Sequence, residues 1–159
     1  MLKLYTEHEG RAVNAGNRFK HVMAITLDSR TDHKDGIIRC ITSREGNVEV
    51  KGYVDRSELY KIHGDSLKKF EIGERLNIKN EKEIIEKLVE KGWDFIGLED
   101  PDIWIDEKTD LAHVYFTIPI KPSEKNLDKS EKIKIHLGHA IGKDLDSLEM
   151  TMPVLMDTV

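Results

Sequence analysis

The stretch Gly97-Leu98-Glu99-Asp100-Pro101-Asp102-Ile103-Trp104-Ile105-Asp106 combines an acidic pair, a proline and an alternation of apolar and polar residues. A polar turn follows it, and then a second run rich in β-forming residues, Val114-Tyr115-Phe116. Alternation with a period of two, bounded by turn residues, is typical of paired strands. We therefore predict a β-hairpin here, with carboxylates gathered where its first strand begins.

An earlier part of the chain repeats this pattern at one constant offset, the offset that brings Asp28 onto Asp106. Asp28-Ser29-Arg30-Thr31-Asp32 matches Asp106-Glu107-Lys108-Thr109-Asp110 with three identities and one exchange of basic residues. Further identities at the same offset, without a gap, include Leu59 with Leu137. Because a repeat unit usually cannot bury its apolar face alone, we predict two similar units packed together. Each unit contains about four short strand patterns, which is the content of one propeller blade.

These patterns set the expected boundaries. We expect strands at 25–27, 37–42, 57–62 and 70–76 in the first unit, and at 103–105, 113–118, 134–141 and 149–155 in the second. The predicted fold class is therefore all-β, in which residues 1–159 form a partial β-propeller domain. Its first four-stranded blade covers about 19–79, a helical insertion covers 80–92, and its second four-stranded blade covers about 93–155.

The predicted insertion is one helix. Asn80 is a suitable N-cap, and Glu83 stands three residues further on, as in a capping box. An apolar stripe at helical spacing runs from Ile84 to Val89. Gly92 is a residue typical of a helix end. We interpret this helix as an insertion packed on the sheets, with an oligomer contact as the alternative.

The composition is that of a highly charged globular protein, with 38% hydrophobic and 35% charged residues and a formal net charge of −5. There is no basic stripe and no run of transmembrane length, so neither nucleic acid nor a membrane is expected as a partner. The first residues lack the apolar core of a signal peptide, and the single cysteine, Cys40, cannot form an internal disulfide. We therefore expect a cytoplasmic protein.

Several stretches resemble glycoside hydrolase family 130, the five-bladed propeller β-mannoside phosphorylases and related hydrolases. Gly97-Leu98-Glu99-Asp100-Pro101 is similar to the Gly-x-Glu-Asp-Pro-Arg motif that opens the second blade in that family. Ile37-Ile38-Arg39 and Arg56-Ser57-Glu58-Leu59-Tyr60 resemble strands of its first blade, and Leu137-Gly138-His139-Ala140-Ile141-Gly142-Lys143-Asp144 resembles its next strand and turn. The resemblance runs from about Phe19 onward and implies a five-bladed β-propeller, of which this chain supplies two blades.

Two departures from the family pattern affect the interpretation. Asp102 stands where the family has an arginine, which puts phosphate binding, and hence phosphorolysis, in doubt. Two blades also leave sheet edges and apolar faces exposed. We therefore interpret the chain as the N-terminal part of such an enzyme, and expect the remaining blades or a homo-oligomeric partner to be needed. The 159 residues alone are expected to be inactive and oligomeric or aggregation-prone.

The resemblance assigns catalysis to Asp100, as the general acid that protonates the leaving glycosidic oxygen. In the family the corresponding aspartate works through a hydroxyl of the bound mannoside. Glu99 and Asp102 are predicted to bind substrate, and Arg39 and Arg56 to bind sugar or phosphate oxygens through paired hydrogen bonds. In the alternative interpretation Asp100 is a strand-start residue, Glu99 is solvated, and both arginines form surface ion pairs.

The acidic pair belongs to one unit only, because the constant offset aligns Glu99 with His21 and Asp100 with Val22. A single central pocket needs one such acid from a repeated scaffold. Inverting glycoside chemistry also needs a base or an anion on the opposite face of the sugar. The second carboxylate, or a phosphate site, is therefore expected from residues outside this chain.

The function predicted from the resemblance is cleavage of β-mannosidic or related bonds in an oligosaccharide, by phosphorolysis or hydrolysis. Two alternatives stay open: another five-bladed propeller glycosidase acting on arabinosides or xylosides, and a non-catalytic glycan-binding or assembly module. No cofactor is expected, with inorganic phosphate a candidate co-substrate. No metal site is expected either, because the seven histidines lack metal-binding spacing.

Overall fold

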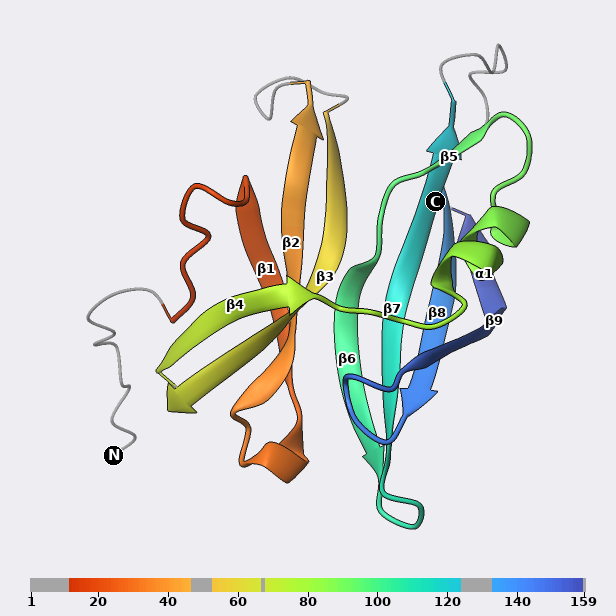
Figure 1. Ribbon diagram of the computed structural model, residues 1–159. Helices are drawn as coiled ribbons and strands as arrows, with labels where there is room; N and C mark the ends of the chain where they lie inside the picture. The colour runs from red at the N-terminus through yellow and green to blue at the C-terminus, as the bar shows by residue number, and fades with distance from the viewer. Residues whose placement is uncertain (1–11, 47–52, 67, 124–132, 159) are drawn as a thin grey trace, which may run out of the picture.

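The computed structural model describes residues 12–46, 53–66, 68–123 and 133–158 (Figure 1). These residues are mostly β-structure, with one short helix, α1 (Glu81–Leu88), and a 3-10 turn at Ser29–Thr31. The strands form two antiparallel sheets. Sheet A contains β1 (His21–Leu27), β2 (Asp35–Glu45), β3 (Val54–Ser66) and β4 (Lys69–Arg75). Sheet B contains β5 (Trp93–Phe95), β6 (Glu99–Asp106), β7 (Leu111–Pro122), β8 (Lys134–Gly142) and β9 (Glu149–Thr158).

The strands of each sheet follow one another largely in chain order. The order in sheet A is β1-β2-β3-β4, and in sheet B β7, β8 and β9 are neighbours while β5 and β6 both pair with β7. Every strand expected from the sequence is present, and β1 and β6 belong to different sheets, as predicted. Only β5 was not expected. The all-β prediction is thereby confirmed.

The pairing registers of the two sheets repeat at the offset seen in the sequence. The equivalent pairs are Arg39 with Leu59 and Thr117 with Leu137 in the central hairpin, and His63 with Glu71 and Ile141 with Glu149 in the last one. In every case the offset between equivalent residues is the one that separates Asp28 from Asp106. Strands β2, β3 and β4 of sheet A and strands β7, β8 and β9 of sheet B, here called the outer strands, therefore pair in the same register.

The two aspartate turns, Asp28–Asp32 and Asp106–Asp110, also have the same local structure. In both, the carboxylate of the first aspartate accepts a hydrogen bond from the backbone amide two residues on, at 2.9 and 3.0 Å. The fifth residue, also an aspartate, has φ of 55° in one turn and 56° in the other. Aspartate tolerates this left-handed conformation better than most residues, which explains its recurrence.

Strands β1 and β6, here called the inner strands, are the exception to the constant offset. Residues 33 and 34 follow the first turn before β2 begins, whereas β7 begins directly after the second turn. As a result Met23 pairs with Arg39 and Glu99 pairs with Thr117, so the offset between the inner strands is shorter than that between the outer strands. The structural counterpart of Asp100 is therefore Ala24 and not Val22, which corrects the assignment made from the sequence.

Equivalent faces of the two sheets point in the same direction. Ile37 and Leu59 of sheet A lie in the core shared by the sheets, together with Phe116 of sheet B. The equivalents of the first two, Tyr115 and Leu137, lie on the opposite side of sheet B, because alternate residues of a strand point to opposite faces. The two sheets therefore do not meet through equivalent faces: sheet A contributes the face that carries Ile37, and sheet B contributes the face opposite to Tyr115.

A second cluster covers the far face of sheet A. Its buried members are Phe19, Ile38, Cys40, Ile62 and Phe70. Val13 and Ala15 from the segment before β1 pack against them. Burial raises the pKa of the Cys40 thiol to about 12. The single cysteine is therefore an inert, protonated part of this core.

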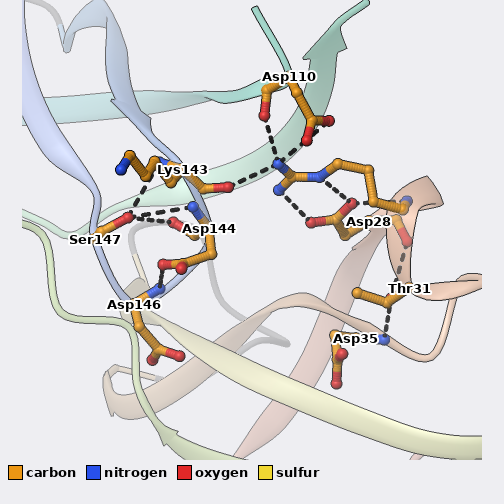
Figure 2. Close-up of polar contacts among 9 residues, drawn as sticks. Asp28, Thr31, Asp35, Asp110, Lys143, Asp144, Asp146 and Ser147 are labelled. Carbon is orange, nitrogen blue, oxygen red and sulfur yellow. Dashed lines mark hydrogen bonds and ion pairs between the residues drawn. The ribbon is translucent and has the colours of Figure 1, made fainter.

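Two contacts join the inner parts of the sheets. Thr26 of β1 accepts a hydrogen bond from the backbone amide of Ile103 of β6, at 3.0 Å. Arg30 of the first turn pairs with Asp28. It also donates to the backbone carbonyls of Asp110, just before β7, and Lys143, just after β8, at 2.8 and 2.7 Å. Figure 2 shows Asp28, Asp110 and Lys143 converging on this point. The two repeated turns are thereby tied together.

Helix α1 lies between the sheets in sequence, and its buried residues Ile84 and Ile85 join the shared core. The predicted capping box is wrong: Asn80 has φ of 64° and makes no capping hydrogen bond, and its amide donates instead to Glu149 at 2.9 Å. The reason is that the preceding residue, Lys79, is already tied to β9. Its backbone amide donates to Leu148, and its carbonyl accepts from Met150. The helix ends at Leu88, earlier than Gly92 suggested.

Within the described part of the chain, no helix combines the length and the apolar character that crossing a membrane requires.

Candidate functional site

The acidic pair lies at the first two positions of β6, where the strand is bulged. The register with β7 shifts between Glu99 and Asp102. Asp100 has φ of 47°, and its counterpart Ala24 in β1 lies in an equivalent bulge with φ of 51°. Such left-handed backbone costs about 1–3 kcal/mol at a residue other than glycine. The bulge separates the two acids, so that the side chain of Asp100 is 58% exposed and that of Glu99 is 17% exposed.

Arg39 of β2 binds both acids of β6. Its Nη1 donates to Oδ1 of Asp100 at 3.0 Å, and its Nη2 makes a short contact with Oε1 of Glu99. The Arg39 side chain is 12% exposed, and its buried Nε has no hydrogen-bond partner among the described residues. The structure therefore brings together three of the five predicted site residues, from two different sheets.

Ser57 of β3 completes this cluster. Its hydroxyl donates to Oε1 of Glu99 at 3.1 Å, so this oxygen accepts from Ser57 and Arg39 at once. Burial raises the pKa of Glu99, and this effect outweighs the opposing influence of the Arg39 charge and the Ser57 hydrogen bond. A titratable group perturbed in this way beside a specific charged partner is a candidate for a functional site.

Arg56 is engaged elsewhere. Its Nε donates to Glu45 at 2.9 Å, and its Nη1 donates to the carbonyl of Phe95 at 2.7 Å. These contacts place it on a hollow of about 580 Å³ that Trp93 and Lys121 also line. Among the described residues, no hydrogen bond or ion pair joins Arg56 to the Asp100 cluster. Its predicted role in substrate binding stays a prediction.

Asp102 lies at the contact between the two sheets. Its Oδ1 accepts from the hydroxyl of Thr26 at 3.5 Å, and the same hydroxyl accepts from the amide of Ile103. Asp102 and Asp100 are both exposed members of β6. Asp102 therefore supplies negative charge near the cluster without contacting Arg39 directly in the described structure.

Sequence reasoning missed Ser57 and the close contact that fixes it. The φ of Gly97 is 158°, and a Cβ built there would lie 2.2 Å from the carbonyl oxygen of Ser57. The same carbonyl accepts a hydrogen bond from Leu98 at 3.3 Å. A glycine two residues before the acidic pair is a signal that another backbone comes close at Gly97. The sequence does not show that this backbone is the one at Ser57.

The cluster can bind hydroxyl groups and stabilise charge through two carboxylates and one shared guanidinium. Within the residues that the structure describes, no group of three or more His, Cys, Asp or Glu residues has an arrangement suited to a metal ion. Comparison with known proteins gives no assignment, since no family model and no curated protein matches the chain.

Proposed function

We propose that this chain forms two blades of a five-bladed β-propeller enzyme that cleaves β-mannosidic or related glycosidic bonds, with Asp100 as the general acid. The observation that carries the proposal is the placement of Asp100. It lies in the bulge at the start of β6, close to the contact between the two sheets, and its carboxylate is exposed. The resemblance to glycoside hydrolase family 130 supplies the substrate class.

The architecture supports the propeller part of this proposal. In a propeller each blade presents the same face to the blade that follows it, so equivalent residues point in one rotational direction. Ile37 faces sheet B, whereas its equivalent Tyr115 faces away from sheet A. The inner strands β1 and β6 also contact each other through Thr26. In the proposed ring, a third blade packs on the face that carries Tyr115.

The chemistry of Asp100 favours hydrolysis over phosphorolysis. In the described structure the cation that contacts Asp100 is Arg39, which is already shared with Glu99. An arginine that neutralises two carboxylates attracts a phosphate dianion less strongly than an unpaired one. The base that activates water then comes from a blade outside this chain, on the opposite face of the sugar.

A non-catalytic glycan-binding module is the second candidate. It is favoured by the ion pairs that Arg39 makes with Glu99 and Asp100, because a carboxylate held by a cation is a good acceptor for sugar hydroxyls but not a proton donor. For either function we place the protein in the cytoplasm, on its composition and its single cysteine.

The decisive test is Asp100→Asn in the full-length protein, assayed on β-1,4-mannobiose with and without inorganic phosphate. The amide keeps the shape but cannot donate the proton, so kcat is expected to fall by about 10²–10⁴-fold. Binding of the disaccharide, measured by calorimetry, should change little in comparison. Hydrolysis predicts the same activity without phosphate.

Asp106→Asn is the matched control, because Asp106 accepts hydrogen bonds within its own turn. It should retain turnover close to that of the unmodified protein. Equal losses in the two variants, or binding without turnover in the unmodified protein, would assign Asp100 a structural or glycan-binding role and reject the enzyme.

A further inference from the structure

Glu99 is directed into the protein, unlike its neighbour Asp100. Its Oε1 is held by the Ser57 hydroxyl and by Arg39, and its backbone carbonyl accepts from Thr117 at 3.4 Å. These contacts come from three strands, β2, β3 and β7. Glu99 is therefore placed to orient Arg39. The carboxylate that is exposed to a ligand is that of Asp100.

Ser57 is itself rigidly placed. Ser57 is only 2% exposed. Gly97 packs so closely against the Ser57 backbone that no side chain fits at position 97. The Leu98 amide bonds to the same backbone. The hydroxyl of Ser57 is thus set at a fixed position relative to the start of β6, where Glu99 lies.

Arg39 depends on this arrangement for its orientation. Its guanidinium is planar, so fixing Nη2 on Glu99 also fixes the direction in which Nη1 points. The hydrogen bond found between Arg39 and Asp100 is a single one, from Nη1 to Oδ1, and not a two-pronged pair. If Glu99 were absent, the guanidinium would be free to turn and grip both oxygens of Asp100.

We propose that Ser57 and Glu99 are positioning residues that hold Arg39 so that it restrains only one oxygen of Asp100. The other oxygen is thereby kept for the glycan. This inference rests on the proposed function of Asp100, but the positioning itself is a property of the protein without substrate. It is therefore measured independently of turnover.

The test uses Ser57→Ala in the full-length protein, followed by carboxyl-carbon NMR titration of Glu99. In the unmodified protein the Ser57 hydrogen bond stabilises the Glu99 carboxylate. Without this bond the pKa of Glu99 should rise further, by about half to one pH unit. The same variant should lose about tenfold in kcat on β-1,4-mannobiose with KM nearly unchanged, because small misplacements of a catalytic group cost up to about 10²-fold. The acidic limb of the pH–rate profile should move with Glu99.

Thr42→Val is the matched control. It removes a hydroxyl that donates to the carbonyl of Arg56 at 3.2 Å. Thr42 lies on the strand that carries Arg39, and no hydrogen bond joins it to Glu99 in the described part of the chain. It should leave the titration of Glu99 unchanged. Glu99→Gln, which keeps an acceptor for Arg39, should lose less kcat than Glu99→Ala.

The outcomes separate the two proposals. If the unmodified protein shows no turnover, the enzyme proposal fails, while the NMR titration still decides whether Ser57 acts on Glu99. If Ser57→Ala lowers the melting temperature but moves neither the Glu99 titration nor the pH profile more than Thr42→Val does, Ser57 is a packing residue and the positioning proposal is overturned.

Discussion

Ala24 and Asp100 occupy the same place in the two copies of the repeat, and they differ in what they offer to a ligand. Both lie in a bulge of an inner strand, and their φ values are 51° and 47°. One presents a methyl group and the other a carboxylate beside Arg39. The unusual backbone is therefore part of the repeated frame, and the chemistry is an addition to one copy.

The outer strands differ in another way. Ile37 of sheet A is completely buried against sheet B, whereas the equivalent Tyr115 of sheet B is only half-buried, beside the ring of His139. The strands repeat from sheet A to sheet B, but the sheet that covers Ile37 has no counterpart over Tyr115 among the described residues. This difference shows which positions derive their stability from the second sheet and which do not.

The largest expected effect tests that difference directly. Ile37→Ala should lower the free energy of unfolding by about 2–5 kcal/mol, because it leaves a cavity between the two sheets. In the 159 residues alone, without the proposed third blade, Tyr115→Ala should cost about 1 kcal/mol, as expected for a side chain that keeps much of its contact with water. Urea unfolding of both variants measures the two values. Equal losses would show that a further element covers sheet B as sheet B covers sheet A.

The sequence was sufficient to predict the repeat and its strands. Apolar alternation and the Asp-x-x-Thr-Asp turns are local signals, and the structure confirms all eight expected strands and the two-sheet arrangement. The matching of Arg39 with Glu99 and Asp100 as site residues came from a family resemblance. Their contact in space agrees with grouping them, although the role of each stays a prediction.

Other features depend on distances between strands that no local pattern encodes. Two additional residues after the first turn shift β1 relative to β6, so the gapless alignment paired Asp100 with Val22 instead of Ala24. Asn80 is a residue type that often caps helices, yet the hydrogen bonds between Lys79 and the start of β9 leave Asn80 in a left-handed conformation. The Ser57 contact and the Arg30 bridge likewise join residues far apart in the chain.

The next effect concerns the two turns. Arg30→Ala should lower the free energy of unfolding by about 1.5–3 kcal/mol, because it removes hydrogen bonds to sheet B and leaves the buried Asp28 without its cation. Lys108→Ala changes the equivalent residue of the second turn, whose side chain is exposed, and should change stability by less than about 0.5 kcal/mol.

The Arg30 variant should also respond differently to acid. Burial alone would raise the pKa of Asp28, but the hydrogen bonds and charge of Arg30 outweigh it and hold this pKa below its usual value. The stability that Asp28 contributes is therefore present above its unfolded pKa, about 3.9, and is lost as the pH falls toward its folded pKa. Melting temperatures between pH 5 and pH 2 should fall less steeply in Arg30→Ala than in the unmodified protein. The same slope in both proteins would contradict the bridge.

The smallest effect tests the shared bulge itself. Ala24→Gly should raise the free energy of unfolding by about 1 kcal/mol, because glycine adopts the left-handed backbone without the steric cost that a Cβ adds. Ala112→Gly is the matched control in β7, where the residue is fully buried and its φ is not positive, and it should lower stability. Both changes delete one methyl group, but the methyl group of Ala112 is fully buried, so its loss adds a packing cost to the backbone cost of glycine. Chemical denaturation of the two variants is the measurement.

If Ala24→Gly destabilises the protein as Ala112→Gly does, β1 lacks the left-handed bulge, and Ala24 is not the counterpart of Asp100. If the stabilisation is found, the strained backbone belongs to both copies, and the carboxylate with its Arg39 partner is what distinguishes the candidate site.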